Sequence, residues 1–459
     1  MSMQQLAEDT VTQPVPEGKE LSWVNRFAYA VGNTGVGMLP AVVGSWAMYY
    51  YAPPPDDPVL RPYIPLAFVG LVLFIGRLAE ALLNPFIGYW SDKTRSRLGR
   101  RIPYILVGTP IMVIAFVLMW YPPVMGESWI NAIWVMVMAM ITHSAFAIVV
   151  APYLSLLPEL TPHNGERITV SSLMAVFEII GTLVAAAGVA WIIDTYKGGI
   201  GGDGPTGFNG FKLAGFLVGA LTFAAFYMTA MKIREKPFSE AKAVSFNFIE
   251  SAKSVFKNNS FTPYLAIVVA IRLALDTVIV VIPYIVTTVM GGTEMDAGYM
   301  MLGIMVIAMI LFPIVNKWSE TRGKKTVMMW GTIGFVIVLP LTSTIGSWPL
   351  VSPMVQGAIV FLLAAFPVSV INVLQRPLIA DVIDYDEKLT GFRREAVYNG
   401  MEGLFTRSAS GMAWLLASLL FWAFGNSTAN PLGILLCGPV AAVILFVGII
   451  IFSRYPFKD

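Results

Sequence analysis

Three polar residues interrupt one of the long apolar stretches of the sequence, and their spacing places them on one face of a helix. Arg77 and Glu80 are three residues apart, and Glu80 and Asn84 are four apart. Glu80 could bind a proton or another cation there, with Arg77 as its charge partner and Asn84 as a neutral ligand. A purely structural buried ion pair would have the same spacing. Because charged groups in such a segment are costly, they predict a pathway, a pairing or both.

Further polar residues lie singly in other apolar stretches. A polar group there is costly unless a cavity, a ligand or a partner satisfies it, so we expect these side chains to contact a bound solute. The candidates are Asn33, Tyr153, Glu178, Asp276, Asn372, Glu402 and Arg407. Interior packing is the alternative interpretation, and Asp276 could also form a structural pair with Arg272, four residues before it.

Two of these carboxylates lack a basic neighbour on their own helix. Glu178 and Glu402 have no Lys or Arg three or four residues away, so each needs a partner from another helix or stays protonated. His143 lies between Thr142 and Ser144 in an apolar stretch. It could relay protons near neutral pH, or it could be a hydrogen-bonded interior residue.

The segments that carry these residues are long enough to cross a bilayer. The 459 residues are 56% hydrophobic and 13% charged, whereas soluble domains are about 25% charged. Apolar windows bounded by charges, Gly or Pro predict twelve transmembrane helices. They lie near residues 26–51, 62–91, 102–122, 129–157, 168–194, 211–232, 260–289, 297–316, 325–345, 350–380, 395–424 and 431–453. Tyr49, Tyr50 and Tyr51, at the end of the first window, are expected in the interfacial aromatic belt.

Basic residues are divided unequally between the two sides that twelve helices define. If the N-terminus is inside, only Arg61, Lys197 and Lys212 fall in outer loops, and most of the 30 Lys and Arg fall in inner segments. By the positive-inside rule both termini are cytoplasmic, and we expect a multi-pass protein of the cell inner membrane. The polar N-terminal lead has no apolar core of a signal peptide before the first helix.

The longest polar interruption divides the helices six and six. The expected parts are a cytoplasmic lead at 1–25, a six-helix bundle at 26–232, a cytoplasmic central loop at 233–259, a six-helix bundle at 260–453 and a cytoplasmic tail at 454–459. The loops that follow the second and eighth helices each contain an acidic residue, a short gap, then Gly and two basic residues. Such a repeat is typical of two pseudo-symmetric halves with a substrate path between them.

The sequence lacks the residues that several other function classes need. Two histidines and the single Cys437 provide no His-rich metal site, Cys–His pair or disulfide, and there is no Walker-type phosphate loop. The formal net charge of +2 gives no basic excess for binding nucleic acid. We therefore expect no enzyme and no cofactor, but a monomer whose partners are a small solute, a coupling cation and the lipid bilayer.

Several motifs resemble those of one family of membrane transporters. They are the loop Gly88-x-x-x-Asp92 through Gly99-Arg100-Arg101, the frame Arg77-x-x-Glu80-Ala81-x-x-Asn84-Pro85, and the segments Ala151 to Thr161 and Ala380 to Glu395. Together they resemble the glycoside-pentoside-hexuronide:cation symporter branch of the major facilitator superfamily. The resemblance implies an all-α membrane protein with twelve transmembrane helices in two pseudo-symmetric six-helix bundles. It also implies secondary active transport by alternating access.

The same resemblance gives the loop after the second helix a role. In the family this loop is a conformational latch that pairs with neighbouring helix ends and holds one access state. The residues at the matching positions are Gly88, Asp92, Gly99, Arg100 and Arg101. A generic positively charged cytoplasmic anchor is the alternative.

Departures from the family pattern bear on the coupling ion and the solute. The family's cation site uses two aspartates of the second helix, and Glu80 and Asn84 stand at those positions. A proton needs one desolvated carboxylate, whereas Na⁺ prefers several oxygen ligands, so we expect H⁺ rather than Na⁺. The positions that hold sugar in the family's melibiose permease correspond to Thr34 and Met174. The resulting prediction is cation-coupled symport of a sugar or glycoside-like solute, with a lysophospholipid or other amphipathic solute as the alternative.

Overall fold

The computed structural model describes residues 21–161, 163–200, 207–235, 255–391 and 394–456. Over these residues, twelve helices or stacked helix runs are long and apolar enough to cross a membrane. This confirms the predicted all-α architecture of twelve transmembrane helices. Most of the expected lead at 1–25 and most of the central loop at 233–259 lie outside the described residues.

The first six spans form one bundle, which we call the N bundle. Its elements are α2 (Trp23–Ala30), α3 (Gly32–Val42), η1 (Val43–Ala47), α4 (Met48–Tyr51), α5 (Leu66–Lys93), α6 (Ile102–Met119), α7 (Trp129–Leu160), α8 (Asn164–Leu183), η2 (Val184–Gly188), α9 (Val189–Tyr196) and α10 (Gly210–Lys232). Within this bundle α5 and α6 pack against α7, and α3 packs against α8 and α10.

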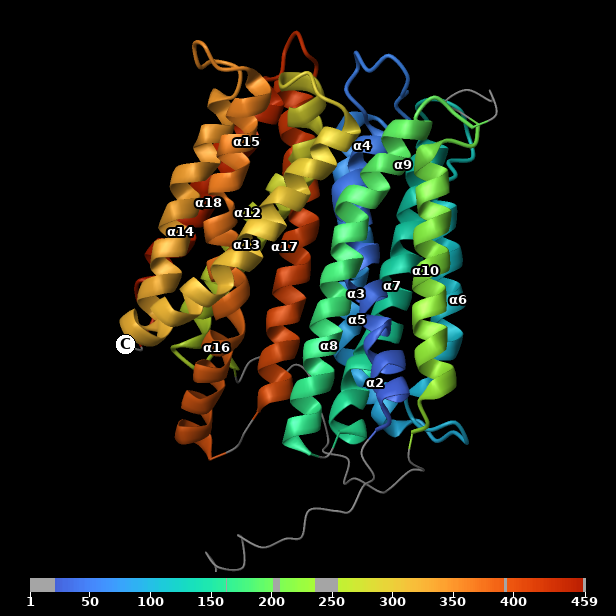
Figure 1. Cartoon of the computed structure of the whole chain (residues 1–459), viewed down its shortest axis with the longest axis vertical. Helices are drawn as coiled ribbons and strands as arrows, with labels where there is room; N and C mark the ends of the chain where they lie inside the picture. The colour runs from blue at the N-terminus through green and yellow to red at the C-terminus, as the bar shows by residue number, and fades with distance from the viewer. Residues whose placement is uncertain (1–20, 162, 201–206, 236–254, 392–393, 457–459) are drawn as a thin grey trace, which may run out of the picture.

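The last six spans form the C bundle. Its elements are α12 (Phe261–Tyr284), η3 (Ile285–Val289), α13 (Glu294–Arg322), α14 (Lys324–Leu341), η4 (Thr342–Thr344), α15 (Pro353–Leu363), α16 (Ala365–Thr390), α17 (Glu395–Phe424) and α18 (Leu432–Phe452). Here α18 packs against α12 and α14, and α16 packs against α13 and α14. Figure 1 shows the two bundles side by side.

Local sequence signals set several helix boundaries. Ser128 caps α7 by accepting a hydrogen bond from the backbone of Ile130. Thr293 and Asp296 form a reciprocal capping box at the start of α13. At the other end of that helix, Gly323 adopts a φ of 81°, which lets the chain turn directly into α14.

The bundles contact each other mainly through three sets of helices. α5 packs along α17, α13 packs against η2 and α9, and α12 packs against η1 and α4. The first pair has very small residues at the contact: a Cβ atom on Gly411 would lie 2.8 Å from Cδ2 of Phe74 on the facing helix. These three contacts therefore join the N bundle to the C bundle.

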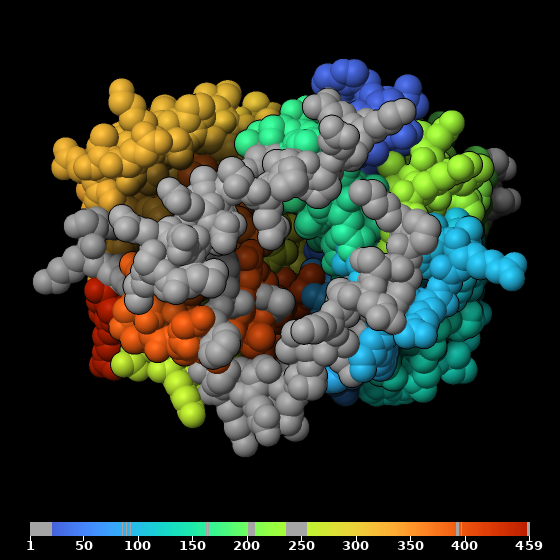
Figure 2. Space-filling model, turned by 90° about the horizontal axis from the view of Figure 1, so that it is seen from below, coloured from blue at the N-terminus to red at the C-terminus, as the bar shows by residue number. Residues whose placement is uncertain are grey.

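The two ends of the molecule differ. At the end that carries loops 52–65 and 425–431, which we call the sealed end, the bundles are bonded to each other. Tyr284 donates a hydrogen bond of 2.8 Å to the carbonyl of Ala52, and Thr428 bonds to Asp56. At the opposite end, the open end, Figure 2 shows a hollow between the orange and red C-bundle helices and the green α8.

The tyrosines at the end of the first span are not in an interfacial belt, so that prediction is wrong. Tyr49, Tyr50 and Tyr51 are at most 1% exposed. They are buried because the span ends inside the sealed end: Tyr50 donates to the carbonyl of Trp120, and Tyr49 donates to Glu294 of the C bundle. Their hydroxyl groups serve helix contacts rather than the membrane surface.

Candidate functional site

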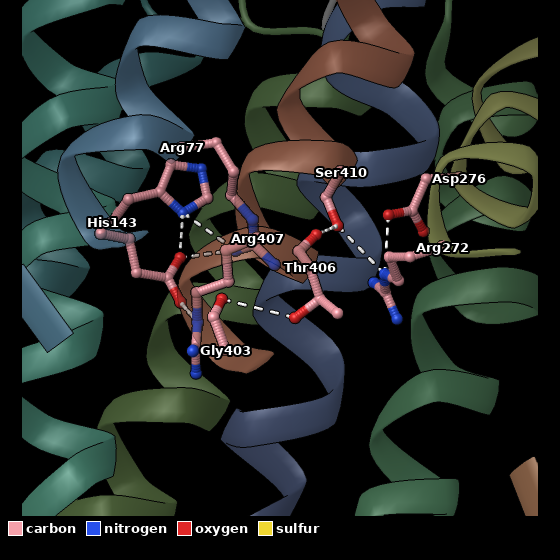
Figure 3. Close-up of polar contacts among 9 residues, drawn as sticks. Arg77, His143, Arg272, Asp276, Gly403, Thr406, Arg407 and Ser410 are labelled. Carbon is pink, nitrogen blue, oxygen red and sulfur yellow. Dashed lines mark hydrogen bonds and ion pairs between the residues drawn. The ribbon is translucent and has the colours of Figure 1, made fainter. Parts of the chain in front are cut away.

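Glu80 of α5 lies at the centre of a charged cluster halfway along the contact between α5 and α17. It is 1% exposed. Its Oε2 accepts a hydrogen bond of 2.6 Å from Nη1 of Arg77, and its Oε1 accepts one of 2.7 Å from Nε of Arg407 on α17 (Figure 3). Arg77 belongs to the N bundle and Arg407 to the C bundle. One carboxylate thus ties the two bundles together by an ion pair.

His143 of α7 completes this cluster. Its Nδ1 lies 3.1 Å from Oε2 of Glu80 and 3.3 Å from Nη1 of Arg77. If Nδ1 carries the ring proton it donates to Glu80, an assignment inferred from the hydrogen-bond pattern. Nε2 of His143 has no hydrogen-bond partner in the described part of the chain. The imidazole therefore offers a second titratable group in contact with the same carboxylate.

Asn84 lies beside the cluster without bonding to it. A Cβ atom on Gly403 of α17 would be 3.8 Å from Nδ2 of Asn84 and 2.6 Å from Nη1 of Arg407. Glycine at position 403 therefore leaves the space that the Arg407 side chain fills. Of the residues predicted to share one face, Arg77 and Glu80 bond directly and Asn84 does not.

A second ion pair adjoins the cluster on the C-bundle side. Nε of Arg272 on α12 donates to Asp276 at 2.8 Å and to Oγ of Ser410 on α17 at 3.0 Å (Figure 3). The Arg272 side chain is 46% exposed and the Asp276 side chain 12%. The predicted pair within one helix is formed, and Ser410 links it to the helix that carries Arg407.

Glu402 is bonded only by neutral groups. Its Oε1 accepts hydrogen bonds from the hydroxyl of Tyr264 on α12, at 2.9 Å, and from Nε2 of Gln375 on α16, at 2.6 Å. Glu402 is 6% exposed. It has no ion-pair partner within 4.0 Å among the residues that the structure describes.

On the N-bundle side, Asn33 and Glu178 come together. Nδ2 of Asn33 on α3 donates to Oε2 of Glu178 on α8 at 2.9 Å and to the carbonyl of Met174 at 3.0 Å. Asn33 is buried, whereas Glu178 is exposed on α8. Figure 2 shows α8 on one side of the hollow.

Tyr153 lies in the core of the N bundle rather than on the hollow. The Tyr153 hydroxyl donates to the carbonyl of Tyr29 at 2.8 Å, and the Tyr29 hydroxyl donates to the carbonyl of Tyr153 at 2.6 Å. Tyr153 has no exposed surface. In this conformation it joins α2 to α7, and a solute could reach it only after a rearrangement.

The exposed face of α16 carries one predicted residue and one that sequence reasoning missed. Asn372 is exposed and donates to the carbonyl of Val368 in its own helix. Arg376, one turn later, is also exposed and makes no hydrogen bond or ion pair with any described residue. The signal was present in the sequence, because an arginine inside an apolar segment is costly unless it faces water, a partner or a ligand.

The predicted latch loop contacts neighbouring ends of its own bundle. Arg100 pairs with Glu159 at the end of α7, and Arg101 bonds to the carbonyl of Ser155. Gly99 has a φ of 102°, and its α-carbon faces the carboxylate of Glu235. That carboxylate accepts a hydrogen bond of 2.8 Å from the backbone of Arg101.

The two remaining positions of the predicted latch are Gly88 and Asp92. Gly88 lies in α5 with open space where a Cβ atom would be. Asp92 lies in the last turn of the same helix, and its side chain is outside the described part of the structure.

A charged network at the sealed end was not predicted. Nζ of Lys197 lies 2.7 Å from Asp57 of the N bundle and 2.5 Å from Glu294 of the C bundle. Glu294 also accepts a hydrogen bond of 2.9 Å from Tyr49. Burial alone would lower the pKa of the Lys197 ammonium, but the nearby carboxylates of Glu294 and Asp57 outweigh it and hold that pKa above its usual value. Lys197 is therefore charged at neutral pH and joins the bundles.

Comparisons with known proteins place the chain among transporters. The family model for MFS/sugar transport proteins matches residues 28–459. The isoprimeverose transporter of Lactiplantibacillus pentosus is 24% identical over 91% of this chain and 84% of its own length. The sodium-dependent lysophosphatidylcholine symporter 1 of Gallus gallus is 23% identical over 96% of this chain and 88% of its own length. A mutant form of the nucleoside transporter NupG has the same fold, with a TM-score of 0.67 at 11% identity over 93% of this chain and 100% of that one.

Proposed function

Because the chain belongs to the MFS/sugar transport protein family, we propose that this secondary transporter couples the movement of a sugar or glycoside-like solute to that of a proton. The observation that carries the proposal is the position of Glu80. One buried carboxylate accepts from Arg77 in its own bundle and from Arg407 in the other. A change in the charge of Glu80 therefore acts directly on a contact between the bundles.

The difference between the two ends supports alternating access. The bundles are bonded at the sealed end and separated by a hollow at the open end (Figures 1 and 2). The positive-inside distribution of Lys and Arg supports cytoplasmic termini and an open end that faces the cytoplasm. With that orientation, this conformation is the inward-facing one, and rocking of the bundles about the α5–α17 contact gives the outward-facing one.

The proton acts by weakening the tie across the bundles. Both oxygens of Glu80 are engaged, Oε1 by Arg407 and Oε2 by Arg77 and His143. A protonated carboxyl group keeps only part of its acceptor capacity, so a proton on Oε1 displaces Arg407. The single carboxylate at this place favours H⁺ over Na⁺, which prefers several oxygen ligands.

Polar residues of both bundles supply the solute contacts. Glu178 and its donor Asn33 belong to the N bundle, and Asn372 belongs to the C bundle. Carboxylates and amides suit the hydroxyl groups of a sugar because they accept and donate hydrogen bonds in fixed directions. Arg376, which is exposed and has no ion pair among the described residues, adds a site for an acidic group on the solute.

A lysophospholipid or similar amphipathic solute is the second candidate. It is favoured by the match to a lysophosphatidylcholine symporter over nearly the whole chain. One of the two aligned sugar positions is also unsuited to sugar recognition, because Met174 is an apolar residue and 5% exposed.

Uptake into proteoliposomes tests both solute and ion. The full chain is reconstituted and offered a panel of methyl glycosides, isoprimeverose and lysophosphatidylcholine, under an imposed pH gradient or an imposed Na⁺ gradient. We expect a glycoside to accumulate when the outer side is acid, with no requirement for Na⁺. Accumulation of lysophosphatidylcholine alone would establish the second candidate. Accumulation driven by a Na⁺ gradient alone would show that Na⁺, and not H⁺, is the coupling ion.

A further inference from the structure

One buried carboxylate has no role in the tie between the bundles. Glu402 lies on α17, where its Oε1 accepts from Tyr264 of α12 and from Gln375 of α16. Three helices of the C bundle therefore converge on this group, and it is 6% exposed. A carboxylate at such a place within a membrane span is costly, and its position calls for a functional explanation.

The hydrogen-bond pattern of Glu402 differs from that of Glu80 in one decisive way. At Glu80 both oxygens accept from charged or titratable donors. At Glu402 both donors bond to the same oxygen, Oε1, and Oε2 has no hydrogen-bond partner in the described part of the chain. A carboxylic acid carries its proton on one oxygen and still accepts on the other. Glu402 can therefore be protonated on Oε2 without losing either hydrogen bond.

The groups around Glu402 leave it without a fixed cation. From α12 it meets the Tyr264 hydroxyl, and from α16 it meets the Gln375 amide. Arg376, next along α16, acts on Tyr264 through its charge. It is exposed, so water screens that charge, and it makes no ion pair with any residue that the structure describes.

Two other groups complete these surroundings. Arg407 of α17 itself is committed to Glu80. Tyr455, which follows α18, contributes a phenol hydroxyl, which donates to the carbonyl of Leu378 at 3.4 Å. None of the charged groups is bonded to Glu402, so uptake of a proton there breaks no ion pair.

We propose that Glu402 is a second proton-binding site, in the C bundle, so that two protons move with each solute molecule. This rests on the proposed function of proton-coupled symport. The proton enters from water in the hollow and binds Oε2, while Tyr264 and Gln375 continue to donate to Oε1. Protonation removes a buried charge from the C bundle, whereas protonation of Glu80 removes the charge between the bundles. One proton thus neutralises a carboxylate inside the C bundle, and the other neutralises the carboxylate between the two bundles.

The stoichiometry of coupling tests the proposal. The full chain is reconstituted, the membrane potential is clamped at zero, and the steady-state accumulation of the transported glycoside is measured against the imposed pH difference. With two protons, accumulation rises about 100-fold per pH unit, and with one proton about tenfold, because each proton contributes a free energy equal to a factor of ten. We expect the first slope for the wild type and the second for Glu402→Gln.

The control is Glu395→Gln, which removes an exposed carboxylate from the same helix and should keep the wild-type slope. Glu402→Asp keeps a group that can be protonated and should retain the steeper dependence. An unchanged slope in Glu402→Gln, or a wild-type slope of one proton, overturns the second site. A weaker solute affinity at every pH with an unchanged slope also overturns it, since Glu402 would then be a solute contact. If the wild type shows no accumulation driven by pH, it is the proposed function that fails.

A second measurement remains informative if Glu402→Gln transports poorly. Infrared difference spectra between acid and alkaline pH detect the carbonyl stretch of protonated carboxyl groups. We expect one such band in the wild type that is missing in Glu402→Gln and present in Glu395→Gln. A spectrum that Glu402→Gln leaves unaltered contradicts the proposal independently of transport.

Discussion

Glu80 accepts hydrogen bonds from guanidinium groups that reach it from different bundles. Arg77 lies one turn before it on α5, and Arg407 comes from α17. Removing one member of a buried ion pair leaves the other charge without compensation, which costs about 3–5 kcal/mol. In the proposed mechanism, the coupling of ion movement and the stability of the bundle contact depend on the same two oxygen atoms.

Glu80→Gln should abolish solute accumulation driven by a pH gradient and preserve solute exchange between equal concentrations. Glutamine cannot take up a proton, but exchange needs no net proton movement. The thermal unfolding temperature should also fall, because Arg77 and Arg407 lose their shared carboxylate. Accumulation and exchange in proteoliposomes, together with a thermal melt, check these expectations.

Glu320→Gln is the control for this variant, because Glu320 is an exposed carboxylate that bonds only to Asn316 among the described residues. It should behave like the wild type in all three measurements. Full accumulation by Glu80→Gln would remove Glu80 from the coupling mechanism and leave it as a structural ion pair.

The sequence predicted polar contacts within a helix better than contacts between helices. Spacings of three and four residues gave Arg77 with Glu80 and Arg272 with Asp276, and both pairs are bonded. Arg407 and Glu80 are 327 residues apart in the sequence. Their contact depends on how α5 and α17 are rotated and aligned against each other. A single sequence does not contain that information, so Arg407 could be predicted only as a solute contact or as a residue packed in the interior.

At the scale of elements, small residues decide where the bundles approach. Gly298 of α13 faces the N bundle: a Cβ atom there would lie 2.5 Å from Cβ of Ala190 and 2.8 Å from the carbonyl oxygen of Ala186. Gly303, further along the same helix, faces its own bundle, where the nearest atom would be Cδ2 of Leu362 at 3.4 Å. One helix thus offers a glycine at the contact between bundles and a glycine away from it.

Gly298→Val should shift the equilibrium toward opening of the sealed end, because neither a helix backbone nor Ala190 can move aside cheaply. A cysteine replacing Thr288, which is buried near this end and whose hydroxyl has no partner among the described residues, serves as the reporter. Its labelling by a membrane-impermeant thiol reagent should become faster in Gly298→Val. Native Cys437 is 1% exposed and adds little background.

Gly303→Val in the same reporter background is the matched control and should leave the labelling rate close to that of the parent. Equal rates for both valine variants would mean that the contact of α13 with α9 does not hold the sealed end closed.

The latch loop gives a prediction about rate rather than affinity. Gly99 has a φ of 102°, and a Cβ atom there would collide with the carboxylate of Glu235. Gly99→Ala therefore strains the backbone and displaces the acceptor of the Arg101 backbone N–H. We expect slower transport with equilibrium solute binding largely preserved, measured by uptake kinetics and by binding calorimetry. A large loss of affinity in Gly99→Ala, with an unaltered conformational equilibrium, would contradict a latch role.

Breaks within spans were beyond the sequence analysis. The window at 350–380 predicted one helix, and the structure has α15 and α16 with Ala364 between them. The first, fifth and seventh spans also contain single π-helical turns. Apolar composition predicts that a segment crosses the membrane, but it does not predict where its hydrogen-bond pattern shifts, because that depends on the packing of neighbouring helices.

On the scale of the whole molecule, the number of spans and the division into two sixes were accessible from hydropathy and the internal repeat. The sequence does not predict which side of the membrane the hollow faces, because the inward-facing and outward-facing forms have the same sequence and the same helices. They differ in which ends of the bundles are bonded. In this structure the difference is made by side chains in loops and helix ends, such as Lys197 and Glu294, whose partners lie far away in the chain.

Lys197→Gln should open the sealed end. The Lys197 side chain is 16% exposed and both of its partners are 4% exposed, so its bonds are largely shielded from water. Without the ammonium group, Asp57 and Glu294 face each other without a cation. Hydrogen bonds to charged groups contribute about 1.5–3 kcal/mol each, so the ratio of open to sealed molecules should rise on the order of tenfold or more.

The pH dependence of this contact has a definite sign. The pKa of Lys197 is raised in the folded protein, so its contribution is complete below the ordinary lysine pKa of about 10.4 and is lost only as pH rises through the raised value. As far as Lys197 is concerned, the sealed end of the wild type should therefore stay closed between about pH 7 and pH 9.

Distances between spin labels at Glu127 and Ser347, exposed residues of the two bundles near the sealed end, measure how far this end opens in Lys197→Gln and in the wild type. Lys212→Gln is the control, because the Lys212 ammonium bonds to the carbonyl of Gly207 in its own bundle. Distances in Lys197→Gln that match those of Lys212→Gln would show that the sealed end is held by its aromatic and helix contacts without the charged network.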